Sequence, residues 1–377
     1  MQRSLCPKTL IDSIALTCLC TESRALAARS IAITSATMQE MTGPVDRRRT
    51  FRWQAAGLAG VLALAATTER AAADPAITPC DRAATVPWTA LHFTAHKFLL
   101  TAAASLTLEL EPASRAQGVL RAAPTGSSLA PQGPCVAVLT FASRLPIGRD
   151  ERAVAWLDPR NGTVFQVDKR TVSGGLYRKV FRYTSDGYFM WRTEPADRRE
   201  AEGDADAWSK RKTEAMRGRA DLPPTSVVTD SYALLYVASA ASLDRPGART
   251  IAYMLDGRGA VVVTFAADGL TTRPIDLELS WPGGSEVRER QTVVRTVTVT
   301  AAPLGGGGAG DDVDLGFLGI RGALTIAIDV ATGLPIELAG RAPQIGTITA
   351  SLRRAELAAP PESYRPAPAP TSPDPTP

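Results

Sequence analysis

The first residues whose type and spacing suggest chemistry are two histidines. His92 and His96 are the only histidines among the 377 residues, and they lie four positions apart. This spacing puts both imidazoles on one face of a strand or of a helix, as a two-histidine metal site requires. No glutamate follows His92 as in the zinc-protease motif, and no third ligand is indicated. The pattern therefore favours two ordinary sheet histidines.

The sequence also gives no indication of a nucleophilic active site. A triad of serine or cysteine with histidine would have to use one of the same two histidines, and the chain has no Gly-x-Ser-x-Gly turn. Residues 307–312, with Asp314, match one copy of a calcium-binding repeat, but such repeats bind calcium only when they are stacked. We therefore expect no enzyme, no catalytic residue, no metal and no cofactor.

Aromatic and basic side chains alternate between residues 177 and 192, a pattern that resembles a nucleic-acid-binding surface. Alternation in paired strands produces the same pattern for structural reasons. The chain after Ala73 is also neutral, because nine of the 42 basic and five of the 38 acidic residues precede residue 74. We therefore expect no nucleic-acid partner.

Residues 1–73 carry the pattern of a leader with a signal peptide. Arginines at positions 47, 48, 49 and 52 precede an apolar run at 53–68, and three alanines end at Ala73. This order of basic, apolar and small residues predicts export and cleavage near Ala73. A membrane anchor is the alternative, but the run is shorter than the roughly 20 residues that a bilayer requires. We expect a periplasmic protein that is not integral to the membrane after cleavage.

The leader also bears on the export route and on the cysteines. Residues 48–51 resemble the twin-arginine export motif, although adjacent arginines are common in basic leaders, and both routes stay open. Met38 and Met41 lie just upstream, and translation from either would leave out three of the five cysteines. The mature chain keeps Cys80 and Cys135. In an oxidising compartment we expect these two to form one disulfide, with two free thiols as the alternative.

Alternating apolar and polar residues dominate the chain after residue 86. Val297 and Val299, for example, point to one face of a strand, and Thr298 and Thr300 point to the other. The same alternation predicts strands at 88–93, 106–110, 136–141, 153–157, 164–169, 177–183, 188–192, 251–255, 261–265, 275–281, 293–300, 324–328, 334–338 and 346–353. We expect a mainly all-β fold, an antiparallel sheet that curls into a barrel or half-barrel with one or two short helices.

Two segments carry helical signals instead. Residues 204–217 place acidic side chains first and basic ones last, which suits a helix macrodipole and predicts an exposed helix. Residues 230–238 follow a cap at Thr229 or Asp230 and place Leu234 and Leu235 on one helical face. We expect this second helix to be buried against the sheet.

Two stretches resemble an uncharacterised family of exported bacterial proteins, the domain-of-unknown-function family 3108. Residues 230–236 are similar to its central helix, although Val237 stands where an arginine is expected. Its closing hairpin is matched by residues 324–329, by Gly333, Leu334, Pro335 and Ile336, and by Gly346 and Leu352. The resemblance covers at most residues 86–357. It implies a β-domain of the cell envelope and supplies no catalytic residue.

Together these observations predict a non-enzymatic periplasmic or cell-envelope protein. We expect one β-rich domain at 80–357, a flexible glycine-rich loop at 305–310 and a disordered proline-rich tail at 358–377. A curved sheet suits a hydrophobic ligand such as a lipid, or contact with another envelope component. A structural or protein-interaction module of the envelope is the alternative.

Overall fold

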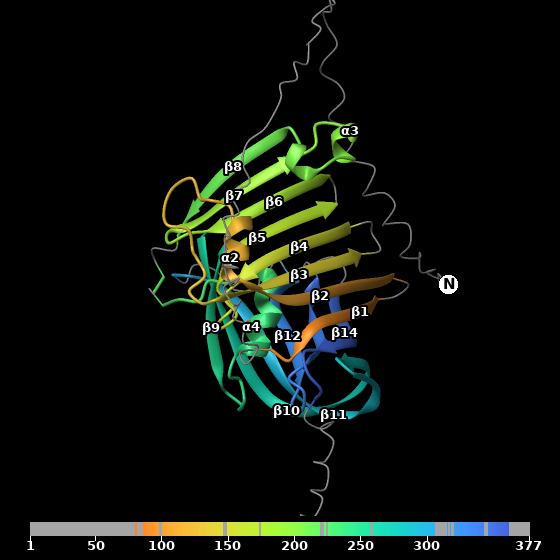
Figure 1. Cartoon of the computed structure of the whole chain (residues 1–377). Coiled ribbons are helices and arrows are strands. Elements are labelled where there is room, and N and C mark those ends of the chain that lie inside the picture. The colour runs from red at the N-terminus through yellow and green to blue at the C-terminus, as the bar shows by residue number, and fades with distance from the viewer. Residues whose placement is uncertain are drawn as a thin grey trace, which may run out of the picture. The chain divides into compact units, whose positions relative to one another are not determined.

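Strands account for most of the described chain (Figure 1). A computed structural model describes residues 80, 86–97, 100–145, 149–172, 175–218, 222–223, 225–256, 259–305, 315, 317, 320–342 and 346–361. They all belong to one compact unit, Ala72–Pro377. The predicted leader, the loop from residue 306 onward with its calcium-repeat match, and the tail after residue 361 lie outside the described residues.

Fourteen strands of the described chain form a single sheet. They are β1 (Trp88–Lys97), β2 (Leu100–Pro112), β3 (Cys135–Leu145), β4 (Arg149–Leu157), β5 (Val164–Val172), β6 (Leu176–Tyr183), β7 (Gly187–Glu194), β8 (Lys210–Arg217), β9 (Arg249–Asp256), β10 (Gly259–Trp281), β11 (Gly284–Pro303), β12 (Arg321–Asp329), β13 (Pro335–Ala342) and β14 (Gly346–Leu357). Their order in the sheet runs from β8 down to β1, then from β14 down to β9.

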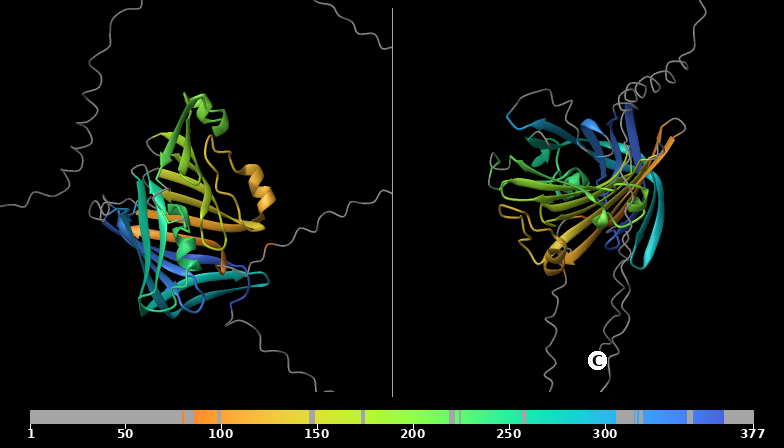
Figure 2. Two further views of the ribbon diagram at one scale, coloured as in Figure 1. Left: turned by 90° about the vertical axis from the view of Figure 1, so that its left-hand side faces the viewer. Right: turned by 90° about the horizontal axis from the view of Figure 1, so that it is seen from above.

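The sheet curls back on itself, which confirms the predicted fold class. Neighbouring strands pair antiparallel, but β10 also pairs in parallel with β14, where Leu279 lies opposite Ala355. This extra pairing closes a ring of five strands, β10 to β14. Strands β1 to β8 extend from the ring as a curved wing, and Figure 2 shows this wing beside the ring.

Every strand predicted from alternation is confirmed. The segments predicted at 261–265 and 275–281 are two parts of one strand, β10, which continues through a register shift between Ala267 and Leu270. Odd-numbered residues are buried on both sides of this bulge, but residues 268–274 between them are all exposed, so the alternation is interrupted there. One long strand therefore reads as two short ones in the sequence.

The buried helix predicted at 230–238 is confirmed. It consists of a 3₁₀ turn, η3 (Ser231–Ala233), followed by α4 (Leu234–Ala240), and Asp230 caps it by accepting a hydrogen bond from the Tyr232 amide. The Tyr236 hydroxyl donates to the Pro159 carbonyl over 2.6 Å. Figure 2 shows α4 inside the curl of the sheet. We call the face of β1–β8 that packs against η3 and α4 the inner face, and the opposite face the outer face.

The predicted helix at 204–217 is wrong, although the exposure predicted for it is right. The segment forms a short 3₁₀ turn, η1 (Ala205–Ala207), and the edge strand β8, in which every residue except Met216 is exposed. Pairing with β7 from Gly187 to Glu194 overrides the weak helical preference. The lysines and arginines that suggested a helix end instead lie along a charged sheet edge, where such residues discourage association with other strands.

Two helices lie outside the predicted ones. Helix α2 (Ala113–Val119) packs on the outer face, where Ala116 is buried with Val136 and Trp156. Helix α3 (Arg198–Ala201) is a single turn capped by Asp197. Figure 2 shows α2 on the side of the wing away from α4.

The turn between β12 and β13 shows the structural role of Asp329, the aspartate of the closing hairpin. Asp329 is buried, and its carboxylate accepts hydrogen bonds from the hydroxyls of Thr292 at 2.6 Å and Thr332 at 2.5 Å. Gly333 adopts a φ of 70°, which favours glycine, and its amide donates to the Asp329 carbonyl. Pro335 begins β13, where no ladder hydrogen bond from its nitrogen is needed.

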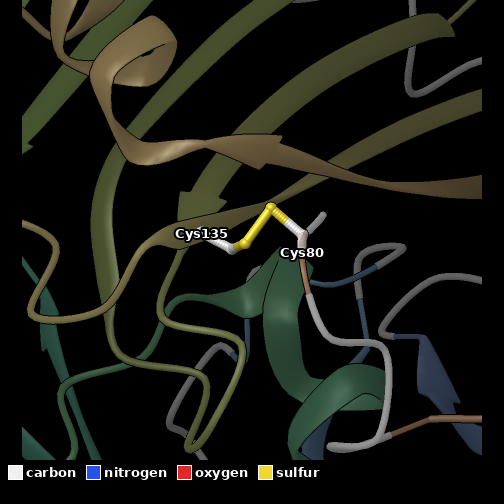
Figure 3. The surroundings of a disulfide bond; sticks show 2 residues. All are labelled: Cys80 and Cys135. Carbon is white, nitrogen blue, oxygen red and sulfur yellow. A yellow bond between two sulfur atoms is a disulfide. The ribbon is translucent and has the colours of Figure 1, made fainter. Parts of the chain in front are cut away.

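Cys80 and Cys135 are joined by a disulfide in the structure (Figure 3). Their Cα atoms lie 5.6 Å apart, within the usual range for a disulfide. Cys135 is the first residue of β3, so the bond attaches the segment before β1 to the middle of the wing.

Removal of this disulfide is expected to lower the free energy of unfolding substantially. The bond closes a loop with a sequence separation of 55 residues. The chain-entropy relation gives about 4 kcal/mol for a loop of this size. Urea unfolding of the wild type and of Cys80→Ser/Cys135→Ser should differ by this order under oxidising conditions and agree under reducing ones. Free alkylation of both thiols in the native protein would contradict the bond.

Candidate functional site

Four basic side chains lie opposite one another on the inner face of the wing, one on each of its strands β5 to β8. In the strand register, Lys169 on β5 lies opposite Lys179 on β6. Lys179 lies opposite Arg192 on β7, and Arg192 lies opposite Lys212 on β8. We call these four residues the basic row. Directly opposed like charges destabilise a sheet, so this arrangement requires neighbouring groups that offset the repulsion.

Carboxylates offset three of the four charges. The Lys169 ammonium lies 3.0 Å from Oε2 of Glu151, and the other oxygen of that carboxylate accepts a 2.5 Å hydrogen bond from the Tyr232 hydroxyl. Arg192 forms an ion pair with Glu194, and Lys212 forms one with Glu214. Glu151 is buried, so its pairing with Lys169 is a structural requirement as well as a contribution to the site.

Lys179 is the member of the basic row that forms no ion pair with any described residue. Its ammonium lies 5.4 Å from the centre of the Tyr177 ring, and the Arg192 guanidinium lies 4.8 Å from the same ring. Burial lowers the pKa of Lys179 below its ordinary value of 10.5, and the charges of Arg192 and Lys169 add to this, although Tyr177 and Glu214 act in the opposite direction. Lys179 therefore carries a positive charge that its surroundings stabilise incompletely.

Two buried tyrosines support this region as neutral hydrogen-bond donors. Burial raises the pKa of Tyr232 and Tyr183 far above the ordinary value, and the carboxylates of Glu151 and Asp230 reinforce the shift. The Tyr183 hydroxyl donates to Asp230 over 2.9 Å. Both phenols therefore stay protonated and fix η3 against the sheet.

An apolar row runs beside the basic row on the same face. Val167, Phe181 and Met190 lie opposite one another on β5, β6 and β7, two residues along each strand from the basic side chains. Phe181 is partly exposed and contacts the Tyr188 ring at 5.5 Å. Met216 on β8, opposite Tyr188, is partly exposed as well. This part of the inner face thus presents charge beside hydrocarbon.

The hollows in the described part of the chain are mostly open. An apolar one between Phe93, Ala104, Ile320 and Leu338 has a volume of about 50 Å³, well below the roughly 300 Å³ of the smallest ordinary ligand pockets. A larger groove of about 510 Å³ is lined mostly by outer-face side chains, among them His92, Arg152 and Arg170, so it lies apart from the basic row.

The histidines are on β1, on one face of the strand as their spacing predicts. His96 shares a 3.0 Å hydrogen bond with the Thr101 hydroxyl, and His92 lies opposite Ser105. Within the residues that the structure describes, no group of three or more potential ligands is arranged to hold a metal ion.

The alternating segment at 177–192 separates into two faces. Lys179 and Arg192 are on the inner face, while Arg178 and Arg182 are on the outer face, where Arg178 pairs with Asp168 at 2.5 Å. Sequence alternation predicts this division. It does not predict that Lys169, Lys179 and Arg192 are in line, because that depends on the register of two hairpins.

The fold and the site define an antiparallel β-protein with a charged and apolar inner face. Comparison with protein-family models, curated proteins and solved structures finds no match to the chain. The resemblance to the exported family stays a prediction. None of the helices in the described ranges has the length and apolar character needed to cross a membrane.

Proposed function

We propose that this chain is a non-enzymatic protein of the periplasm or cell envelope that holds a hydrophobic or amphiphilic ligand, such as a lipid, on its inner face. The observation that carries the proposal is the pair of partly exposed apolar side chains Phe181 and Met216, which lie near the basic row on one curved surface. An amphiphile matches such a surface because its chain and its head group need different neighbours. The leader pattern at 1–73 supports the location.

The partly exposed side chains indicate where the hydrocarbon of the ligand would lie. Phe181 and Met216 are the members of this surface that retain contact with solvent. Each CH₂ group removed from water contributes about 0.8 kcal/mol, so burial of about ten such groups matches the roughly 8 kcal/mol of micromolar binding. A ligand held on this open surface does not need an enclosed cavity.

Protein released from its own envelope without detergent is expected to retain lipid in native mass spectrometry. Met216→Lys should lose most of this lipid, because it places a charge in the path of the hydrocarbon. Thr213→Lys is the matched control, since it adds the same charge to the same strand on the exposed outer face. Protein without lipid, or equal retention by the two variants, would contradict the proposal.

A protein-interaction module is the second candidate, and β8 is the observation that favours it. This strand is one of the two edges of the described sheet, and Lys210 to Ala215 are all exposed. An edge strand can accept a strand from a partner through main-chain hydrogen bonds, and the basic side chains of β8, which discourage most such pairing, would favour an acidic partner strand. A specific protein in place of lipid in the same mass spectra would support this function.

A further inference from the structure

We propose that Lys179, with Lys169 and Arg192 on either side, binds the phosphate group of a ligand on the inner face of the wing. The inference rests on the proposed function in one respect, since it assigns this phosphate to the head of the amphiphile. A free phosphate compound would satisfy the same three cations. The experiment below distinguishes the two sources.

The register brings the three cations to one place. Lys169, Lys179 and Arg192 occupy directly paired positions on three neighbouring strands, and such strands are about 4.8 Å apart. All three side chains leave the sheet on the inner face. Lysine and arginine side chains are long enough for their charged ends to meet around a single oxyanion above β6.

The charges around Lys179 favour an added anion. Glu151 and Glu194 neutralise the two flanking cations, and Glu214, which pairs with Lys212, acts on Lys179 without forming an ion pair with it. Lys179 is left half-buried with like charges on both sides. A phosphate oxygen would supply the missing counter-charge, and its attraction is stronger here than in bulk water because the surroundings are partly desolvated.

Tyr177 and Thr171, which lie near Lys179, also favour a phosphate site. Tyr177 places its ring against both Lys179 and Arg192, which limits the positions that the two cations adopt. Thr171 is 1% exposed, lies between Glu151 and Tyr177 in the register, and its hydroxyl has no hydrogen-bond partner among the described residues. Buried hydroxyls normally have a partner, so a water or a ligand oxygen would have to enter this position to supply one.

Protection of a sheet edge does not explain Lys179. Basic residues on edge strands prevent association with other sheets, and Lys212 on β8 fits that role. Lys179 is two strands in from the edge and is partly buried, where a charge gives no such protection.

The test is isothermal titration of the full mature chain with three probes: dodecyl phosphate, dodecanol and inorganic phosphate. Dodecyl phosphate should bind more tightly than dodecanol, which has the same chain without the anion. Lys179→Gln should weaken dodecyl phosphate binding roughly tenfold to a hundredfold, the effect of losing a hydrogen bond to a charged group. Lys179→Arg, which keeps the cation, should restore most of the affinity.

Arg217→Gln is the matched control, because it removes the same charge from the exposed outer side of β8 and should change little. Circular dichroism establishes that each variant is folded. Equal binding of dodecyl phosphate by Lys179→Gln and Arg217→Gln would overturn the phosphate site while leaving the hydrophobic ligand in place. Inorganic phosphate binding that depends on Lys179, without binding of either dodecyl probe, would support the site and contradict the proposed lipid. Binding of none of the probes would overturn both.

Discussion

Ile336→Asp and Ile326→Asp are each expected to prevent folding or to lower the free energy of unfolding by about 4 kcal/mol. The two isoleucines are 6% and 0% exposed and lie on neighbouring strands of the five-strand ring. Ile326 lies opposite both Leu338 and Val297. An aspartate at either position would bring a carboxylate with no cation into this apolar interior, which is the costliest kind of core substitution.

Glu337→Lys is the matched control for these two variants. Glu337 lies between Ala327 and Ser351, is partly exposed, and points to the other face from Ile336. Reversal of its charge should change stability by less than about 0.5 kcal/mol. Thermal and urea unfolding of the three variants measure the difference. Similar small losses in all three would show that the assignment of faces in β12 and β13 is wrong.

The hairpin of β12 and β13 was predictable because the alternation of its strands and the residues of its turn indicate the same structure. Alternation sets the faces at 324–328 and 334–338, and Gly333 supplies the turn. Asp329 is the residue whose role needed the structure, because one of its partners, Thr292, lies on another strand, 37 residues away in sequence. A local pattern cannot indicate such a contact.

The segment at 204–217 shows where local reasoning fails. Its order of charges fits a helix end, but β7 offers Lys210–Arg217 a row of hydrogen-bond partners that only the assembled sheet contains. Helix preference is worth less than 1 kcal/mol per residue, so strand pairing readily overrides it. The basic row depends on non-local register in the same way, which is why alternation alone did not reveal it.

Substitution of Arg182 is the second change expected to lower stability strongly. Nothing in the sequence around Arg182 distinguishes it from Arg178. Its guanidinium donates to the carbonyls of Phe165 at 2.7 Å, Leu129 at 2.7 Å and Arg121 at 2.8 Å. The residue is 4% exposed. Burial lowers the pKa of Arg182, but an arginine keeps its charge in proteins, so these carbonyls are its stabilising partners. Arg182 thereby joins the chain at 121–129 to β5 and β6 on the outer face.

Arg182→Leu is therefore expected to lower the free energy of unfolding by about 4 kcal/mol, because several buried carbonyls lose their donor at once. Arg182→Lys should lose nearly as much, since one ammonium cannot replace a planar fork that reaches three chain segments. Arg199→Leu, at an exposed position of α3, controls for the lost charge and should cost less than about 0.5 kcal/mol. Urea unfolding gives the values. Faster proteolytic cleavage between 121 and 129 in Arg182→Lys would show that the lost stability comes from this segment. Wild-type stability in that variant would show that the buried charge alone, rather than its three-way hydrogen bonding, holds the segment in place.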